Sequence, residues 1–260
     1  MAHQFTSKAR ASQREGLDSA EILTARTDLA ACLRMAAQLG FAEGICNHFS
    51  ALVPGHSDLF LVNPYGLAFA EITASSLLIC DFAGNVVQGD RQPEATAFHI
   101  HAQLHRCKPG AVAAFHTHMP NATALAMLEG PPLRWAGQTS LKFYGRVAVD
   151  ESFNGLALDQ HEGQRLADAM GDADVLFMKN HGVLVSAASI ALAWDDLYYL
   201  ERAAEVQLRA MSSGVALEEI APEIASLTAA QMRVDEESSA QAHLQSIKRQ
   251  LDKATPEFRN

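Results

Sequence analysis

The segment "AVAAFHTHMPNA", residues 111–122, contains the pattern from which the fold and the function can be inferred. A run of small apolar residues ends in two histidines, His116 and His118, and Pro120 follows them. The run predicts a buried strand, and the proline predicts the start of a helix in "PNATALAMLEG". Because side chains two residues apart on a strand face the same side, we expect both imidazoles to project together at the carboxyl end of this strand.

Two imidazoles on one strand are a weak indication of a metal site, and ordinary structural histidines are the alternative. A third histidine, His181, follows another apolar strand in "DVLFMKNHGVLVSA" and directly precedes a glycine turn. Three histidines with an open coordination position make a divalent ion a Lewis acid. Glu94 in "RQPEATAFHIH" is a candidate base or further ligand, or simply an acid that the helix dipole favours in a first turn.

The rest of the chain predicts a mixture of helices and short strands. Apolar spacing predicts helices within residues 18–40, 93–108, 158–172 and 188–214, and short strands within residues 44–55, 59–66, 72–90, 111–118 and 174–187. Residues 133–149 are expected to be extended. The hairpin-like strand pairs favour an α/β fold with an antiparallel sheet covered by helices. We expect a flexible N-terminal arm over residues 1–16, one main domain over residues 17–214, and a helical C-terminal tail over residues 215–260.

Composition excludes several classes of protein. The chain has 260 residues, 48% hydrophobic and 19% charged, which is enough for a substantial core. Its net charge of −10 argues against a nucleic-acid partner or an anionic membrane surface. Neither a secretory signal nor a membrane span is expected, since the start lacks an apolar segment and no apolar run approaches the necessary length. The four cysteines form no CxxC pair and are expected to be reduced thiols, so we predict a cytoplasmic location.

Three stretches, in this order, resemble the class II aldolase/adducin family: "NPYGLAFAEITASSLLICDFAGNVVQGD", "PEATAFHIHAQLHRCKPGAVAAFHTHMPNATALA" and "KNHGVLV". The resemblance runs from about residue 25 to residue 212. It implies a three-layer α/β/α sandwich with a mainly antiparallel central sheet, usually assembled as a homotetramer with active sites between subunits. It further implies zinc or a similar divalent ion held by His116, His118 and His181, and a catalytic glutamate at Glu94.

The departures from that family concern the substrate. Its sugar-phosphate aldolases hold phosphate with a Gly-Asn-x-Ser stretch, a Ser-Gly pair and a Ser-Ser pair. Here the corresponding positions fall on His48, on Tyr65-Gly66 and on Gln92-Pro93. Pro93 has no N–H group, and phosphate would lose several charge-assisted hydrogen bonds. We therefore expect a substrate without a terminal phosphate, with His48 and Gly66 among the residues that bind it.

Some residues allow two interpretations. Three histidines share the predicted helix after Glu94, where a supporting or structural role is favoured over a place in the site: His99, His101 and His105. Tyr144 in "FYGRVAV" could protonate a carbanion or alkoxide across a subunit interface, or it could only pack. Arg146 could pair with a substrate carboxylate or with any nearby acid.

The predicted function is that of a metal-dependent lyase. It would cleave a carbon–carbon bond next to a carbonyl in a small non-phosphorylated hydroxy-carbonyl or acid substrate, through a metal-stabilised enediolate. Glu94 would shuttle the proton. Aldol cleavage, decarboxylation and epimerisation share this intermediate and stay open. The alternatives are a sugar-phosphate aldolase or 4-epimerase, and a non-catalytic adducin-like interaction module.

Overall fold

The computed structural model describes residues 16–156 and 159–260, so the arm predicted over residues 1–16 lies outside the described residues except for Gly16. In the described part, eight strands form one sheet in the order β4-β3-β2-β1-β5-β8-β7-β6. Only β6 and β7 pair in parallel there, and the other neighbours pair antiparallel. The strands are β1 (His48–Leu52), β2 (Leu59–Val62), β3 (Leu78–Asp81), β4 (Val86–Gln88), β5 (Ala113–Thr117), β6 (Val147–Asp150), β7 (Val175–Met178) and β8 (Gly182–Ala187).

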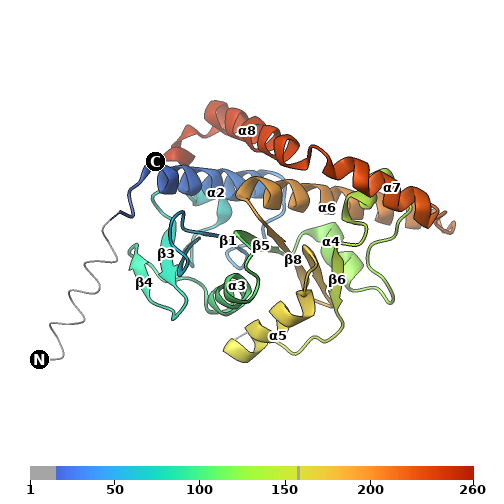
Figure 1. Cartoon of the computed structure of the whole chain (residues 1–260), viewed down its shortest axis with the longest axis horizontal. Coiled ribbons are helices and arrows are strands. Elements are labelled where there is room, and N and C mark those ends of the chain that lie inside the picture. Colours follow the sequence, from blue (N-terminus) through green and yellow to red (C-terminus); the bar gives the residue numbers. More distant parts are fainter. Residues whose placement is uncertain (1–15, 157–158) are drawn as a thin grey trace, which may run out of the picture.

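Helices cover both faces of this sheet, which confirms the predicted α/β/α sandwich (Figure 1). One face is covered by α2 (Ala20–Gln38), α4 (Pro120–Ala126) and α6 (Ile190–Met211). The other face is covered by α3 (Ala95–Cys107) and α5 (Gln160–Met170). Beyond α2 and α6 lie α7 (Pro222–Arg233) and α8 (Glu236–Ala254), and the short 3-10 helices are η1 (Phe69–Glu71), η2 (Gln138–Phe143) and η3 (Pro256–Arg259).

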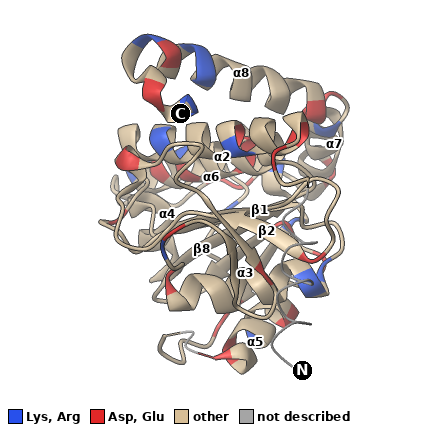
Figure 2. Ribbon diagram, turned by 90° about the vertical axis from the view of Figure 1, so that its left-hand side faces the viewer, with Lys and Arg blue, Asp and Glu red and all other residues tan. Residues whose placement is uncertain are grey.

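The two faces of the sheet have separate cores because strand side chains alternate. On the α2 and α6 side, the rings of Phe49 and Phe115 stack with their centroids 4.1 Å apart. On the α3 and α5 side, Ala114 and Leu184 pack with helical apolar residues. Figure 2 shows acidic and basic residues mainly along the helices and loops, whereas the strands carry few. Sheets buried on both faces read as apolar runs, as the sequence around residue 113 does.

Residues 215–260 contribute to the same core. Leu244, Ile247 and Leu251 on α8 are buried against α2 and α6, and Phe258 in η3 is fully buried. The domain boundary at residue 214 remains a prediction. Within the described residues, none of the helices combines the length and the apolar run that crossing a bilayer requires.

The prediction that residues 133–149 are extended is wrong for residues 138–143, which form η2. Gly137 precedes this helix, and its carbonyl accepts from the Ser140 N–H at 3.1 Å. Leu141 and Phe143 are buried, and η2 packs against α6 and α7. Tertiary packing therefore decides the conformation of a segment whose local pattern is weak.

The contact between α3 and α5 gives a test of this packing. A Cβ at Gly163 would stand 2.8 Å from the carbonyl carbon of His99 and closer still to its oxygen. Gly163→Ala should therefore destabilise the fold by about 1–3 kcal/mol, as overpacking does, although alanine normally stabilises a helix interior. Urea unfolding measures the change. Gly110→Ala is the control, because a Cβ there meets nothing within 4 Å. Equal stability of both variants would contradict this close approach.

Candidate functional site

The ends of three central strands, β1, β5 and β8, lie together along one edge of the sheet, perpendicular to the strands. In the β1–β5 pair, His48 lies opposite His116, and in the β5–β8 pair Thr117 lies opposite Val183. The turn between β7 and β8 therefore meets the end of β5 and the start of β1 at this edge. The loop after β2 is held there too, because the Asn63 side chain accepts from the Phe49 N–H at 2.9 Å.

His116, His118 and His181 form a compact cluster at this edge. Their ring centroids are 4.9–5.0 Å apart, with interplanar angles of 63–77°. One ring nitrogen from each lies within 4.8 Å of the other two. The structure thus brings together the three residues that the sequence predicted as metal ligands.

Hydrogen bonds at Nδ1 identify the donor nitrogen of His116 and of His118. His116 Nδ1 donates to the Val183 carbonyl at 2.9 Å, and His118 Nδ1 donates to the Glu43 carboxylate. The neutral form of each ring therefore has its unprotonated nitrogen at Nε2. A carboxylate or carbonyl behind the imidazole is the arrangement that orients histidines toward metals.

His181 enters the cluster through a tight turn. Asn180 has φ +58°, a conformation that asparagine tolerates better than most residues. Gly182 follows, and a Cβ there would lie 2.6 Å from the Thr117 carbonyl oxygen and 2.8 Å from His118 Cδ2. Only glycine lets β8 approach β5 this closely without displacing His118. The sequence Asn-His-Gly is therefore required by the geometry of the turn.

The cluster fits a divalent cation. Burial, reinforced by the neighbouring histidines, lowers the pKa of His116 well below its ordinary value and the pKa of His181 to about 4. Both rings are then neutral near pH 7, as metal ligands must be. His118 Nε2 is buried and has no hydrogen-bond partner among the described residues. A cation bound by three imidazoles would satisfy this atom, and zinc accepts such a ligand set.

Glu94 and Gly66 lie on segments that contact each other beside this edge. Glu94 caps α3, where its Oε2 accepts from the Ala97 N–H at 2.9 Å and from the Thr96 hydroxyl. It does not belong to the histidine ligand cluster found among the described residues. The Tyr65 N–H donates to the Gln92 carbonyl at 2.9 Å, which joins the Tyr65-Gly66 turn to the segment leading into Glu94.

Tyr144 and Arg146 make other contacts within the described part of the chain. The Tyr144 ring packs edge-on against Trp135, with centroids 5.3 Å apart. Arg146 forms ion pairs of 2.6–2.9 Å with Asp174, Asp196 and Glu236. Its guanidinium is therefore used by nearby acids, the second of the two interpretations above.

A buried chain of polar side chains continues from His48 into the layer between β1 and α3. His48 Nδ1 lies 2.7 Å from His101 Nε2, and Ser50 Oγ lies between His101 Nδ1 and His105 Nε2, at 2.5 and 2.8 Å. Both helical histidines were candidates from the sequence, but their partners were not predicted. The signal was present, since His48 and Ser50 share a strand face and His101 and His105 are four residues apart on a helix. Glu43, on an exposed loop, gave no such signal.

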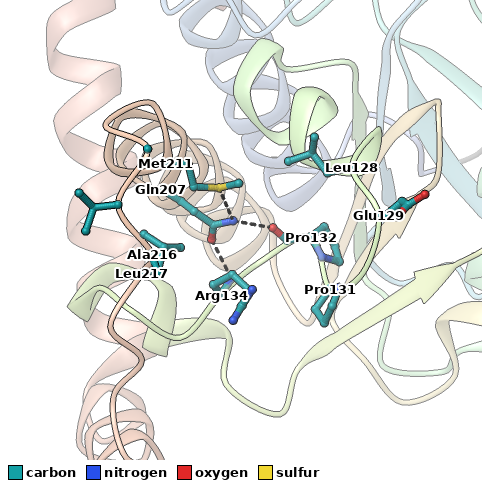
Figure 3. A pocket seen from close by; sticks show the side chains of 11 residues that line it. Leu128, Glu129, Pro131, Pro132, Arg134, Gln207, Met211, Ala216 and Leu217 are labelled. Carbon is teal, nitrogen blue, oxygen red and sulfur yellow. Dashed lines mark hydrogen bonds between the residues drawn. The ribbon is translucent and has the colours of Figure 1, made fainter.

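A cavity of about 440 Å³ lies apart from this cluster, at the end of α6 (Figure 3). None of its lining residues is a histidine. The polar wall is already paired: Gln207 donates to the Pro132 carbonyl at 2.8 Å and accepts from the Arg134 N–H at 2.7 Å. We therefore assign the chemistry to the histidine cluster, because the cavity is lined by one carboxylate, Glu129, and by no group of candidate metal ligands among the described residues.

The chain is similar to known proteins over most of its length. The profile of the family described as "Class II Aldolase and Adducin N-terminal domain" matches residues 27–208. The decarboxylase NovR of Streptomyces niveus is 32% identical over 78% of this chain and 75% of its own length. The crystal structure of an aldolase II superfamily protein from Pseudomonas syringae superposes with a TM-score of 0.88 and 32% identity, covering 96% of this chain and 100% of that one.

A second solved structure is similar over most of its length. The L-fuculose 1-phosphate aldolase of Glaciozyma antarctica PI12 has a TM-score of 0.81 and 26% identity, with 92% of both chains covered. Because the family profile spans most of the chain and a 32% identical structure covers 96% of it, this protein belongs to the class II aldolase and adducin family.

Proposed function

We propose that this protein is a metal-dependent lyase that breaks a carbon–carbon bond next to a carbonyl, by aldol cleavage or decarboxylation. The observation that carries the proposal is the cluster of His116, His118 and His181, with ring nitrogens within 4.8 Å of one another. The buried, unpartnered Nε2 of His118 supports it. A non-catalytic member of the family would have no need to keep such an atom buried, at a cost of about 1–3 kcal/mol.

A divalent ion, most simply zinc, would supply a Lewis acid for the negative charge that develops when the bond breaks. The side chains of this chain would do the rest. Glu94 is the proposed proton carrier: its hydrogen bonds to described residues all involve Oε2, so Oε1 can accept or return a proton. The N–H of Gly66 is the proposed donor to the substrate, on a turn with φ +88° that glycine adopts without strain.

The hydrogen-bond donors at the positions that hold phosphate in sugar-phosphate aldolases are already used or missing. The Tyr65 N–H donates to Gln92, Pro93 has no N–H, and His48 Nδ1 is paired with His101. We therefore propose a small non-phosphorylated hydroxy-carbonyl or acid as substrate. The similarity to a decarboxylase supports the acid, and the similarity to a fuculose-phosphate aldolase supports the alternative of a sugar phosphate.

The metal assignment predicts that each cluster histidine is needed. His116→Ala, His118→Ala and His181→Ala should each weaken zinc binding by at least about a hundredfold, more than loss of an outer partner costs, and abolish turnover. Zinc content after dialysis, with circular dichroism to monitor folding, measures this. His56→Ala is the control, because His56 lies in the β1–β2 turn at the opposite edge of the sheet.

Wild-type zinc content in two of the three variants would overturn the assignment. A wild-type protein that binds no divalent ion in metal-replete buffer would instead favour the adducin-like interaction module.

The substrate proposal predicts poor recognition of phosphate. Each lost charge-assisted hydrogen bond costs about 1.5–3 kcal/mol, so two losses weaken phosphate binding by more than about a hundredfold. Paired substrates or inhibitors that differ only in phosphate against carboxylate or hydroxyl should show this difference in Ki or kcat/KM. Efficient turnover of fuculose phosphate or ribulose phosphate would establish the alternative, a sugar-phosphate aldolase or 4-epimerase.

We further propose a homotetramer with sites between subunits. Tyr144 packs on Trp135 within its own chain, and we propose that it acts as proton donor in the site of a neighbouring subunit. Exposed apolar side chains on α6 support an interface, with Tyr199 39% and Val206 54% exposed. Light scattering at micromolar concentration should give four times the mass of one chain. A monomer would remove both the tetramer and the role of Tyr144.

A further inference from the structure

The polar chain that leads from Ala111 to His48 has a fixed starting point. His105 Nδ1 lies 2.6 Å from the Ala111 carbonyl oxygen, and a carbonyl can only accept. From there the chain passes through His105 Nε2, Ser50 Oγ and both nitrogens of His101 to His48 Nδ1. All four residues, His48, Ser50, His101 and His105, are at most 5% exposed. Bulk water therefore does not replace the hydrogen bonds between them.

The starting point determines the direction of every later bond. His105 must donate through Nδ1, so its Nε2 is an acceptor in the neutral ring and takes the Ser50 proton. Ser50 has then used its one proton and must accept from His101 Nδ1. His101 Nε2 is in turn an acceptor, so His48 must donate through Nδ1. The remaining nitrogen of His48, Nε2, is left with a lone pair.

One competing arrangement exists. The Ala114 carbonyl oxygen lies 3.5 Å from Ser50 Oγ and could accept its proton. His101 and His105 would then both have to donate to Ser50, and His105 would carry protons on both nitrogens. Burial lowers the pKa of His105 to about 4, so a doubly protonated His105 is disfavoured near neutral pH. The longer bond is also the weaker of the two.

The free nitrogen of His48 belongs to the site. The His48 ring lies between His101 and His116, with centroids 4.8 Å from each. Its Nδ1 edge faces His101, so Nε2 lies on the opposite side of the ring. This atom has no hydrogen-bond partner among the described residues, and the His48 residue as a whole is 2% exposed.

We infer that His48 presents an unprotonated Nε2 to the site as a fixed hydrogen-bond acceptor, held in this state by the one-way chain that begins at the Ala111 carbonyl. It therefore binds a hydroxyl group or a water molecule and rejects an anionic oxygen. That His48 Nε2 binds the substrate rests on the proposed function, whereas the tautomer of His48 does not. His48 is then a specificity residue that selects a hydroxyl-bearing substrate.

The test uses the full-length protein labelled with ¹⁵N-histidine, in which solid-state ¹⁵N spectra distinguish protonated from bare ring nitrogens. Histidine-to-glutamine variants assign the signals. In metal-free protein at pH 7, His48, His101 and His105 should each show a protonated Nδ1 and an unprotonated Nε2. Addition of inorganic phosphate, at a concentration typical of a phosphate buffer, should leave the His48 signals unchanged. A protonated Nε2 on His48, with or without phosphate, overturns the inference.

Ser50→Ala tests the chain itself. The hydrogen bond of His48 is to His101 and not to Ser50, yet without the Ser50 hydroxyl His48 should change from one tautomer to a mixture of both. Ser186→Ala is the matched control, a fully buried serine on β8 whose Oγ has no partner among the described residues. A single, unchanged His48 tautomer in Ser50→Ala would overturn the inference, and the wild-type spectrum decides the matter if that variant does not fold.

The same samples separate this inference from the proposed function. With ¹¹³Cd²⁺ as the probe, coupling to ¹⁵N is expected at His116, His118 and His181. Missing coupling at all three contradicts the proposed metal centre and leaves the His48 tautomer standing. Coupling at His48 Nε2 would show that this nitrogen is a ligand and would overturn its role as an acceptor.

Discussion

Antiparallel pairing of β1, β5 and β8 is the constraint on which the site depends. It places His48 opposite His116 and brings the β7–β8 turn to the end of β5. A slip of one residue in either pair would turn one set of side chains to the opposite face of the sheet. Gly182 keeps the second pair close, since any side chain at this position would collide with β5. The positions of the ligands thus follow from backbone register.

The layer between β1 and α3 shows a second constraint. Two elements that pack face to face normally bury apolar side chains, but here Ser50, His101 and His105 are buried instead. Each buried polar atom left unpaired would cost about 1–3 kcal/mol. The chain of hydrogen bonds avoids this cost because it begins at the Ala111 carbonyl, which accepts from His105. The donor and acceptor roles that follow from this bond extend to His48 at the edge of the site.

Much of this organisation could be predicted from local patterns. The apolar run before His116 predicted a strand with both of its histidines on one face, and Asn-His-Gly predicted the turn that carries His181. The helix predicted within residues 93–108 is α3, where Glu94 is the N-cap. These patterns are legible because alternation, helical period and turn chemistry act between residues close in sequence.

Other features depended on tertiary structure. The hydrogen bond from His118 to Glu43, the ion pairs of Arg146 with nearby acids and the helical conformation of residues 138–143 each require partners far along the chain. The sequence by itself determined which residue types could bind a metal and on which strand ends they lie. Only the tertiary structure decided which nitrogen of each imidazole is free, because a tautomer is set by the partner on the other side of the ring, and that partner is supplied by sheet register and burial.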